Sequence, residues 1–172
     1  MKKLLRKIKE FRFVQYKVYG QDIHIDGTNS WQDVIVDAFS WIPLFTLLFV
    51  TRPYREIVKE IDTSKPVTLY LHSIGNAWGN WIAFLLFMRY KTVGHIESGG
   101  GVTSLPFFIV NHMIKNKWTG KYIINGNDPI PLFWPHFKRF GEVVYIGDKR
   151  TPLNTIKQFF HLRTGDHIGY WS

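Results

Sequence analysis

A serine in residues 71–75, with the sequence LHSIG, lies where the pattern of the chain changes abruptly. Residues 67–71 are a short run rich in β-forming side chains, typical of a buried strand, and residues 77–90 have helical apolar spacing. A serine on so sharp a turn projects its hydroxyl above the sheet, while the N–H of Ile74 can point into an oxyanion hole. Ser73 is therefore a candidate nucleophile, although a serine before a helix is also an ordinary N-cap.

A serine nucleophile needs a base, and in folds with such a turn the partners follow in the order Asp or Glu, then His. Asp128 follows a predicted strand at residues 121–124, and His167 follows a predicted helix at residues 153–162. Taken singly, an Asx-turn before proline explains the aspartate, and a surface loop explains the histidine. Because all three stand in the required order and context, we expect Ser73, Asp128 and His167 to form a catalytic triad.

The elements that would carry these residues follow from apolar periodicity. A hairpin is predicted from strands at residues 11–19 and 23–25, and helices from residues 31–40 and 54–61. From residue 67 onward the pattern is βαβαββα, which predicts a mostly parallel sheet with sites at the carboxyl ends of its strands. No repeat or linker divides the chain, so residues 1–172 are expected to form a single domain. The further predicted strands are residues 67–71, 92–97, 121–124 and 143–146, and the further helices are 77–90, 105–115 and 153–162.

Around these residues the chain resembles the class 3 lipases, the fungal triacylglycerol lipase group of the α/β-hydrolases. Family members carry an R-G-[ST] turn, a G-H-S-x-G-G elbow, an N-x-x-D-x-[VI]-P segment and a late D/N-H-x-x-Y segment. The matching segments here are residues 26–28 (DGT), 72–77 (HSIGNA), 125–131 (NGNDPIP) and 166–170 (DHIGY). The resemblance covers most of the chain between the first and the last of these segments.

The resemblance implies a compact, three-layer α/β-hydrolase-like fold. It also implies a serine hydrolase that cleaves carboxylic esters through an acyl-enzyme, with lipid or acylglycerol esters as the substrate class. By this similarity Ser73 is the nucleophile, His167 the base and Asp128 the carboxylate that orients it. The N–H groups of Thr28 and Ile74 would be the oxyanion-hole donors, and no cofactor is implied.

Three positions depart from the family pattern. Leu71 stands where the family has the first elbow glycine, Asn76 where it has the last, and Asp26 replaces the arginine. Small residues at an elbow let strand and helix approach closely. The Leu71 side chain must therefore either wedge strand and helix apart, displacing the Ile74 N–H, or line the cleft. This departure keeps a second hypothesis open, namely a catalytically inactive lipase-like fold that binds lipid or another anionic partner.

The charge of the chain favours anionic partners. Lys and Arg number 22 and Asp and Glu 13, which gives a net charge of +9. Much of the excess lies in residues 1–12, where apolar side chains recur at helical spacing, as in an interfacial helix or a basic surface helix docked on the domain. No nucleic-acid-binding motif is present, so nucleic acid ranks last as a partner. An ester or lipid substrate and peripheral contact with an anionic membrane surface are the partners we expect.

The most apolar stretch, residues 34–50, contains Asp37 and Pro43 and leaves only residues 41–50 uncharged. This is too short for an ordinary membrane span, so a buried helix or a lipid-facing flap is expected. Residues 1–12 lack the apolar core and cleavage site of a secretory signal, and a cytoplasmic protein is therefore expected.

Metal and thiol chemistry are not expected. The chain has no cysteine, which excludes a disulfide scaffold, a thiolate metal site and a cysteine nucleophile. Its seven histidines lack metal-ligand spacing such as H-E-x-x-H. The glycines at residues 99–101 lack the spacing and lysine of a phosphate-binding loop and are expected to form a turn, and the resemblance implies a strand-to-helix turn beside the site.

Overall fold

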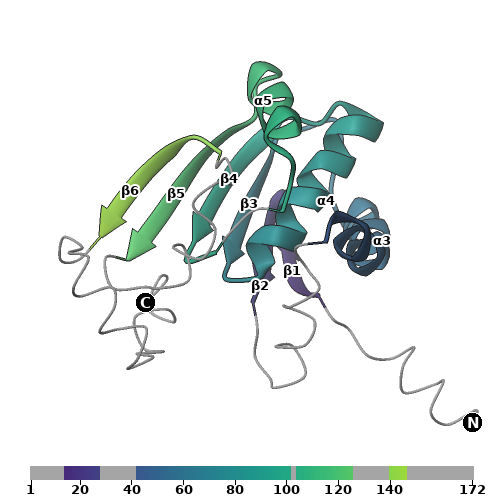
Figure 1. Cartoon of the computed structure of the whole chain (residues 1–172). Coiled ribbons are helices and arrows are strands. Elements are labelled where there is room, and N and C mark those ends of the chain that lie inside the picture. Colours follow the sequence, from purple (N-terminus) through teal and green to yellow (C-terminus); the bar gives the residue numbers. More distant parts are fainter. Residues whose placement is uncertain (1–13, 28–41, 102–103, 126–139, 147–172) are drawn as a thin grey trace, which may run out of the picture.

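In the computed structural model, the described residues are 14–27, 42–101, 104–125 and 140–146, and they form one six-stranded sheet with three helices beside it (Figure 1). In chain order the elements are β1 (Gln15–Tyr19), β2 (Asp22–Asp26), α3 (Pro43–Glu60), β3 (Val67–His72), α4 (Gly75–Tyr90), β4 (Gly94–Gly99), α5 (Phe107–Lys115), β5 (Thr119–Asn125) and β6 (Glu142–Ile146).

The strands lie in the sheet in the same order as in the sequence, from β1 to β6. β1 and β2 are antiparallel and form the predicted hairpin, and Gly20, at φ 64°, occupies the first position of its two-residue turn. Every other neighbouring pair is parallel. The predicted α/β class with a mostly parallel sheet is therefore confirmed.

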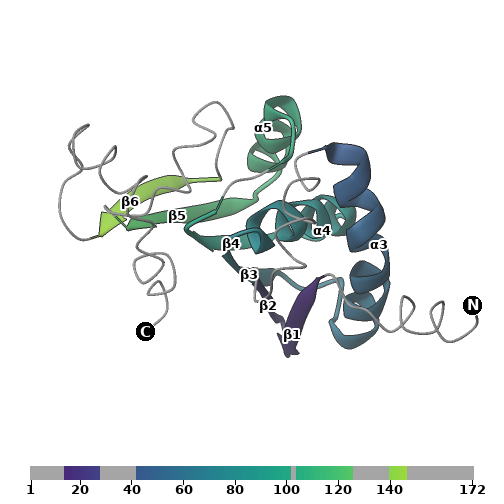
Figure 2. The same cartoon turned by 60° about the horizontal axis from the view of Figure 1, so that its bottom comes forward.

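All three described helices lie on the same side of the sheet (Figure 2). Crossover connections between parallel strands are right-handed, so strands added in one direction place their helices on one face. Within the described residues the fold thus has two layers, and no described helix supplies the third layer that we expected. The predicted helices at residues 31–40 and 153–162 lie outside the described residues.

The core lies between the sheet and the helices. Val67, Leu69 and Leu71 alternate along β3 as buried residues facing α4, whereas the residues between them are only half-buried. α4 packs on β2, β3 and β4 and against α3, so it is buried on nearly all sides, with Trp78 and Ile82 fully enclosed. Each large apolar side chain buried in this way contributes about 1.5–3 kcal/mol to stability.

One predicted boundary was wrong. The helix expected at residues 54–61 begins at Pro43 and contains Pro53 in its interior. A proline lacks the N–H that would donate one helical hydrogen bond, and its ring crowds one carbonyl of the preceding turn. In α3 the packing of the surrounding apolar residues outweighs this cost. Val50, Tyr54 and Ile57 are the buried residues on either side of Pro53. Among the described residues, no helix is long and apolar enough to cross a membrane.

Candidate functional site

The turn between β3 and α4 consists of two residues, Ser73 and Ile74, because β3 ends at His72 and α4 begins at Gly75. Ser73 has φ 54°, in the left-handed region that a residue with a side chain rarely adopts. This conformation costs about 1–2 kcal/mol, so the surroundings must hold it in place. Such strain is concentrated at functional sites. The other described non-glycine residues with positive φ, Lys91 and Lys117, follow the ends of helices, where this conformation is common, so the turn at Ser73 is the candidate site among the described residues.

Three glycines allow the chain to pack closely around Ser73. A Cβ atom on Gly27, just after β2, would collide with the Cβ of Ser73 and lie 3.1 Å from its Oγ. A Cβ on Gly75 would collide with the carbonyl oxygen of Ile25, and one on Gly101 with the carbonyl oxygen of Ser73. The turn is therefore packed against the carboxyl ends of both neighbouring strands, β2 and β4.

The backbone of Ser73 is held at both its N–H and its carbonyl. Its N–H donates to the carbonyl of Gly99, the last residue of β4, at 3.1 Å. Its carbonyl accepts a hydrogen bond of 3.1 Å from the N–H of Asn76. The end of β4 and the first turn of α4 thus fix the serine between them.

Asn76 adds its side chain to the same contacts. Its Nδ2 donates to the carbonyl of Ser73 at 3.0 Å and to the carbonyl of Gly99 at 3.2 Å, and its Oδ1 accepts a hydrogen bond from the hydroxyl of Ser98. The side chain of Asn80 donates to the Asn76 carbonyl. Only 1% of Asn76 is exposed, so these bonds form in a buried, low-dielectric setting where they are strongest.

Neither outcome expected for Leu71 is found: its side chain lies between strand and helix rather than in the cleft, but it does not wedge them apart. It is fully buried and points from β3 toward α4, where its side chain occupies the space that a Cβ atom on Gly79 would fill. The expected wedging of strand and helix does not follow, because Gly79 lets the helix pass close to the leucine. At the elbow the small residue, Gly79, therefore lies on the helix, and the large residue, Leu71, lies on the strand.

The structure places some of the predicted site residues and leaves others outside its description. Ser73 and Ile74 lie at the carboxyl end of β3, beside Gly27. Thr28, Asp128 and His167 lie outside the described residues. β5, which precedes the aspartate in the sequence, is parallel to β3 and therefore ends at the same edge of the sheet (Figure 1).

Sequence reasoning missed Ser98, and it treated Asn76 only as a departure from a glycine. The glycines at residues 99–101 were the available signal, since they were expected beside the site. Gly99 and Gly101 do contact the elbow, as expected.

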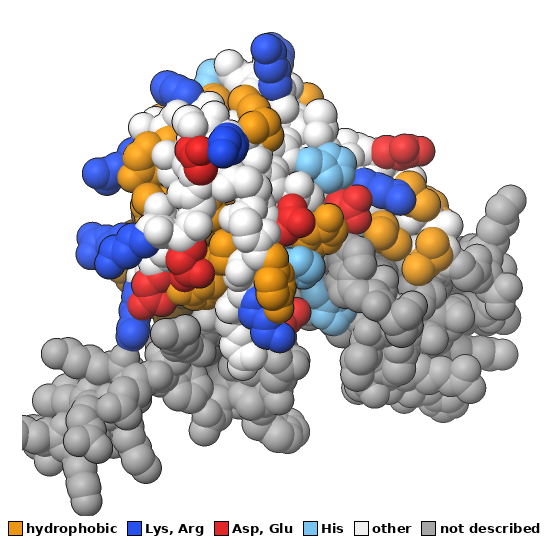
Figure 3. Space-filling view, turned by 180° about the vertical axis from the view of Figure 1, so that it is seen from behind, with side chains coloured by type: hydrophobic (Ala, Val, Ile, Leu, Met, Phe, Trp, Pro, Cys, Tyr) orange, Lys and Arg blue, Asp and Glu red, His pale blue; other side chains and the backbone are white. Residues whose placement is uncertain are grey.

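The opposite face of the sheet is polar. His24 of β2 stacks on Tyr70 of β3 with ring centroids 4.6 Å apart, and His95 of β4 contacts Thr119 at 2.8 Å and Glu97 at 3.7 Å. Burial, followed by the nearby carboxylates, raises the pKa of the Tyr70 hydroxyl above its ordinary value. Figure 3, seen from behind, shows histidine and acidic side chains gathered on this face. No group of metal-ligating residues is found in the described part of the chain.

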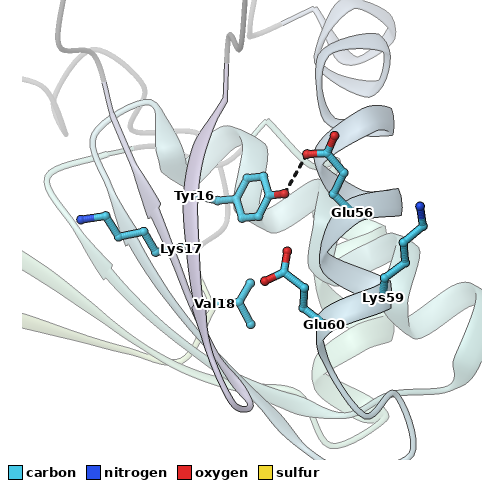
Figure 4. A pocket seen from close by; sticks show the side chains of 6 residues that line it. All are labelled: Tyr16, Lys17, Val18, Glu56, Lys59 and Glu60. Carbon is cyan, nitrogen blue, oxygen red and sulfur yellow. Dashed lines mark hydrogen bonds between the residues drawn. The ribbon is translucent and has the colours of Figure 1, made fainter. Parts of the chain in front are cut away.

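A groove of about 410 Å³ lies at the edge of the sheet, between β1 and the second half of α3. Figure 4 shows Glu56 and Glu60 of α3 facing Tyr16 and Val18 of β1. The Tyr16 hydroxyl donates to Glu56 at 2.8 Å. The groove is lined by Tyr16, Lys17, Val18, Glu56, Lys59 and Glu60, none of which is a serine or a histidine.

Comparisons with known proteins found no relative: no family model, no curated protein and no solved structure matches the chain.

Proposed function

We propose that the protein is a serine hydrolase that cleaves carboxylic esters through an acyl-enzyme on Ser73. The hydroxyl of Ser73 attacks the ester carbonyl while His167 accepts its proton and Asp128 orients the imidazole. The N–H groups of Ile74 and Thr28 stabilise the negative charge that develops on the carbonyl oxygen. His167 then protonates the leaving alcohol, and water releases the acid by the reverse sequence.

The observation that supports this proposal best is the conformation of Ser73. Its positive φ, at the carboxyl end of a central parallel strand and directly before a helix, is what a nucleophile elbow requires. Among the described residues, the N–H of Ile74 donates no hydrogen bond, so it is available to a substrate oxyanion. A serine that served only as an N-cap would not need this strained backbone.

Lipid or acylglycerol esters are the substrates that we propose. The first turns of α3 expose apolar side chains that could contact an acyl chain or a lipid surface, and Leu44 and Leu48 are more than 60% exposed. A net charge of +9 would favour peripheral contact with an anionic membrane surface. The alternative, an inactive fold that only binds such partners, rested mainly on Leu71, and the space at Gly79 removes the steric argument for it.

Labelling with a fluorophosphonate probe, followed by peptide mass spectrometry, tests the proposal. We expect the wild-type chain to be labelled at Ser73 and to hydrolyse short-chain esters, and Ser73→Ala to do neither. Ser64→Ala is the matched control, because Ser64 is an exposed loop serine whose N–H and hydroxyl donate hydrogen bonds to Asp62. This variant should leave labelling unchanged. If the wild type is neither labelled nor active on any ester, the binding-module hypothesis replaces this one.

A further inference from the structure

The side-chain amide of Asn76 is buried beside Ser73. Asn76 stands where the class 3 pattern has glycine. A glycine there would leave the backbone contacts of Ser73 unchanged, because these use only main-chain atoms. The side chain adds a second donor to the Ser73 carbonyl and a bond to Ser98. A buried polar side chain whose hydrogen-bonding atoms are all engaged rigidifies its surroundings and specifies one arrangement.

The Ser73 carbonyl and the Ile74 N–H belong to the same peptide unit. That unit is planar, and it is trans, since no cis peptide occurs in the described chain. In a trans peptide the carbonyl and the N–H point in opposite directions. Whatever fixes the direction of the Ser73 carbonyl therefore also fixes the direction in which the Ile74 N–H points.

We propose that Asn76 is a positioning residue for the oxyanion hole: by holding the Ser73 carbonyl, its side chain aims the Ile74 N–H at the reacting oxygen. This inference rests on the proposed function of Ser73. Gly99 serves as the anchor, because its carbonyl accepts both from the Ser73 N–H and from Asn76 Nδ2. Ser98 in turn holds Asn76 Oδ1, which leaves Nδ2 directed at the two carbonyls.

Two variants separate positioning from general support of the fold. Asn76→Ala removes the side-chain donor to the Ser73 carbonyl. Thr92→Ala is the matched control, because it removes the side-chain hydrogen bond of another buried residue, from the Thr92 hydroxyl to the Thr63 carbonyl at 2.8 Å, just before the opposite end of β4 from Gly99. Both should lower the thermal midpoint, and activity is compared at a temperature well below both midpoints.

With a short-chain ester, we expect Asn76→Ala to lower kcat about 10- to 100-fold with KM nearly unchanged, the range for a misplaced oxyanion donor. The dissociation constant of a trifluoromethyl ketone, which forms an oxyanion adduct with the serine, should rise by a similar factor. Thr92→Ala should keep both quantities within about threefold of wild type. Equal losses of kcat in the two variants, or an undiminished kcat in Asn76→Ala, would overturn the inference.

A further variant covers the case in which Asn76→Ala does not fold. Asn76→Ser keeps a donor that can reach the Ser73 carbonyl three residues back but loses the bond to the Gly99 carbonyl, so it should lower kcat several-fold more than Thr92→Ala does. An Asn76→Ser variant that folds and keeps as much kcat as Thr92→Ala contradicts the inference.

A measurement independent of activity separates failure of this inference from failure of the proposed function. The residual dipolar coupling of the Ile74 N–H reports its direction relative to β3 and α4. It should change in Asn76→Ala or Asn76→Ser and stay the same in Thr92→Ala. If the wild type lacks hydrolase activity while this coupling behaves as expected, only the proposed reaction fails. An unchanged coupling in the Asn76 variants refutes the positioning role.

Discussion

The elbow at the end of β3 and the groove between β1 and α3 are built in opposite ways. At the elbow, glycines 27, 75 and 101 bring the backbone into van der Waals contact, and the backbone bonds of Ser73 run to two different elements. In the groove, ionisable side chains lie around an open hollow, and its two sides are joined by a side-chain hydrogen bond from the Tyr16 hydroxyl to Glu56 at 2.8 Å.

The difference shows where chemistry can be supported in this fold. A hollow lined with carboxylates and lysines resembles a binding site, but exposed charged side chains are screened by water and are not held in one direction. A reacting group needs a fixed direction, which requires backbone held by several neighbours. The crowded elbow meets that requirement and the groove does not.

The largest expected effect comes from removing the nucleophile. Ser73→Ala should lower kcat by about a thousandfold or more without changing the thermal midpoint appreciably, because the hydroxyl does chemistry and fills little volume. Glu56→Gln, in the groove, should keep full ester turnover. If the groove variant loses activity and the serine variant retains it, the roles of the two regions are reversed.

The triad as a whole should behave as one unit. His167→Ala combined with Asp128→Asn should cost little more in kcat than His167→Ala alone, because residues that act together in one step are not additive. Steady-state kinetics of the two single variants and the double variant measure this. Losses that multiply independently would exclude a triad made of these residues.

Two glycines of α4 test the packing of the elbow. Gly75→Ala should lower the free energy of unfolding by about 3 kcal/mol, because its new Cβ meets the backbone of Ile25. Gly79→Ala should cost about 1 kcal/mol or less, because its Cβ meets the movable end of Leu71 and alanine favours the helix. Chemical denaturation measures both, and equal costs would contradict this account.

Leu71 and Gly79 should also be energetically coupled. Leu71→Ala should cost about 2–3 kcal/mol by leaving a cavity beneath α4, without raising kcat. In the double variant Leu71→Ala with Gly79→Ala, the added methyl group fills part of that cavity, so the cost should be less than the sum of the single costs. A rise in kcat for Leu71→Gly would show that the leucine does wedge the elbow apart.

In the groove, Tyr16→Phe removes the hydrogen bond to Glu56 and should lower the free energy of unfolding by about 1 kcal/mol. Ester turnover should not change. A loss several times larger would mean that the groove is as tightly built as the elbow.

The smallest effect concerns the polar face of β3. The pKa of Tyr70 is raised in the folded protein, so the folded state holds this proton more tightly than the unfolded state does. The stability that this provides is complete below about pH 10 and decreases as the pH rises toward the folded-state pKa. Tyr70→Phe should therefore show a shallower loss of stability at alkaline pH, measured by denaturation between pH 9 and pH 11.

The sequence was informative where local pattern and tertiary packing agree. Residues 67–71 were predicted as a strand that turns sharply at Ser73, because a run of β-forming side chains ends there and helical apolar spacing begins soon after. It failed at Pro53, because tertiary burial around α3 outweighs a local helix-breaking preference.

The support of the site was harder to predict. Asn76 bonds to Ser98 and Gly99 across more than twenty residues of sequence, and the pairing of Leu71 with Gly79 depends on how closely a helix crosses a strand. Neither follows from spacing along one element, because the first requires the position of β4 beside β3 to be known, and the second requires the approach of α4 to β3. Asp128, His167 and Thr28 remain predictions from the order of residues in the sequence.

The sequential strand order has a consequence for how the protein is made. Each described strand pairs with the one before it in the sequence, so the sheet can grow from its first hairpin as the ribosome extends the chain. Ser73 leaves the ribosome before Gly99 and Gly101, two of the residues that restrain it. The nascent serine thus lacks part of the support for its strained backbone until β4 has docked, and the emergence of β4 sets the earliest moment at which the elbow can be completed.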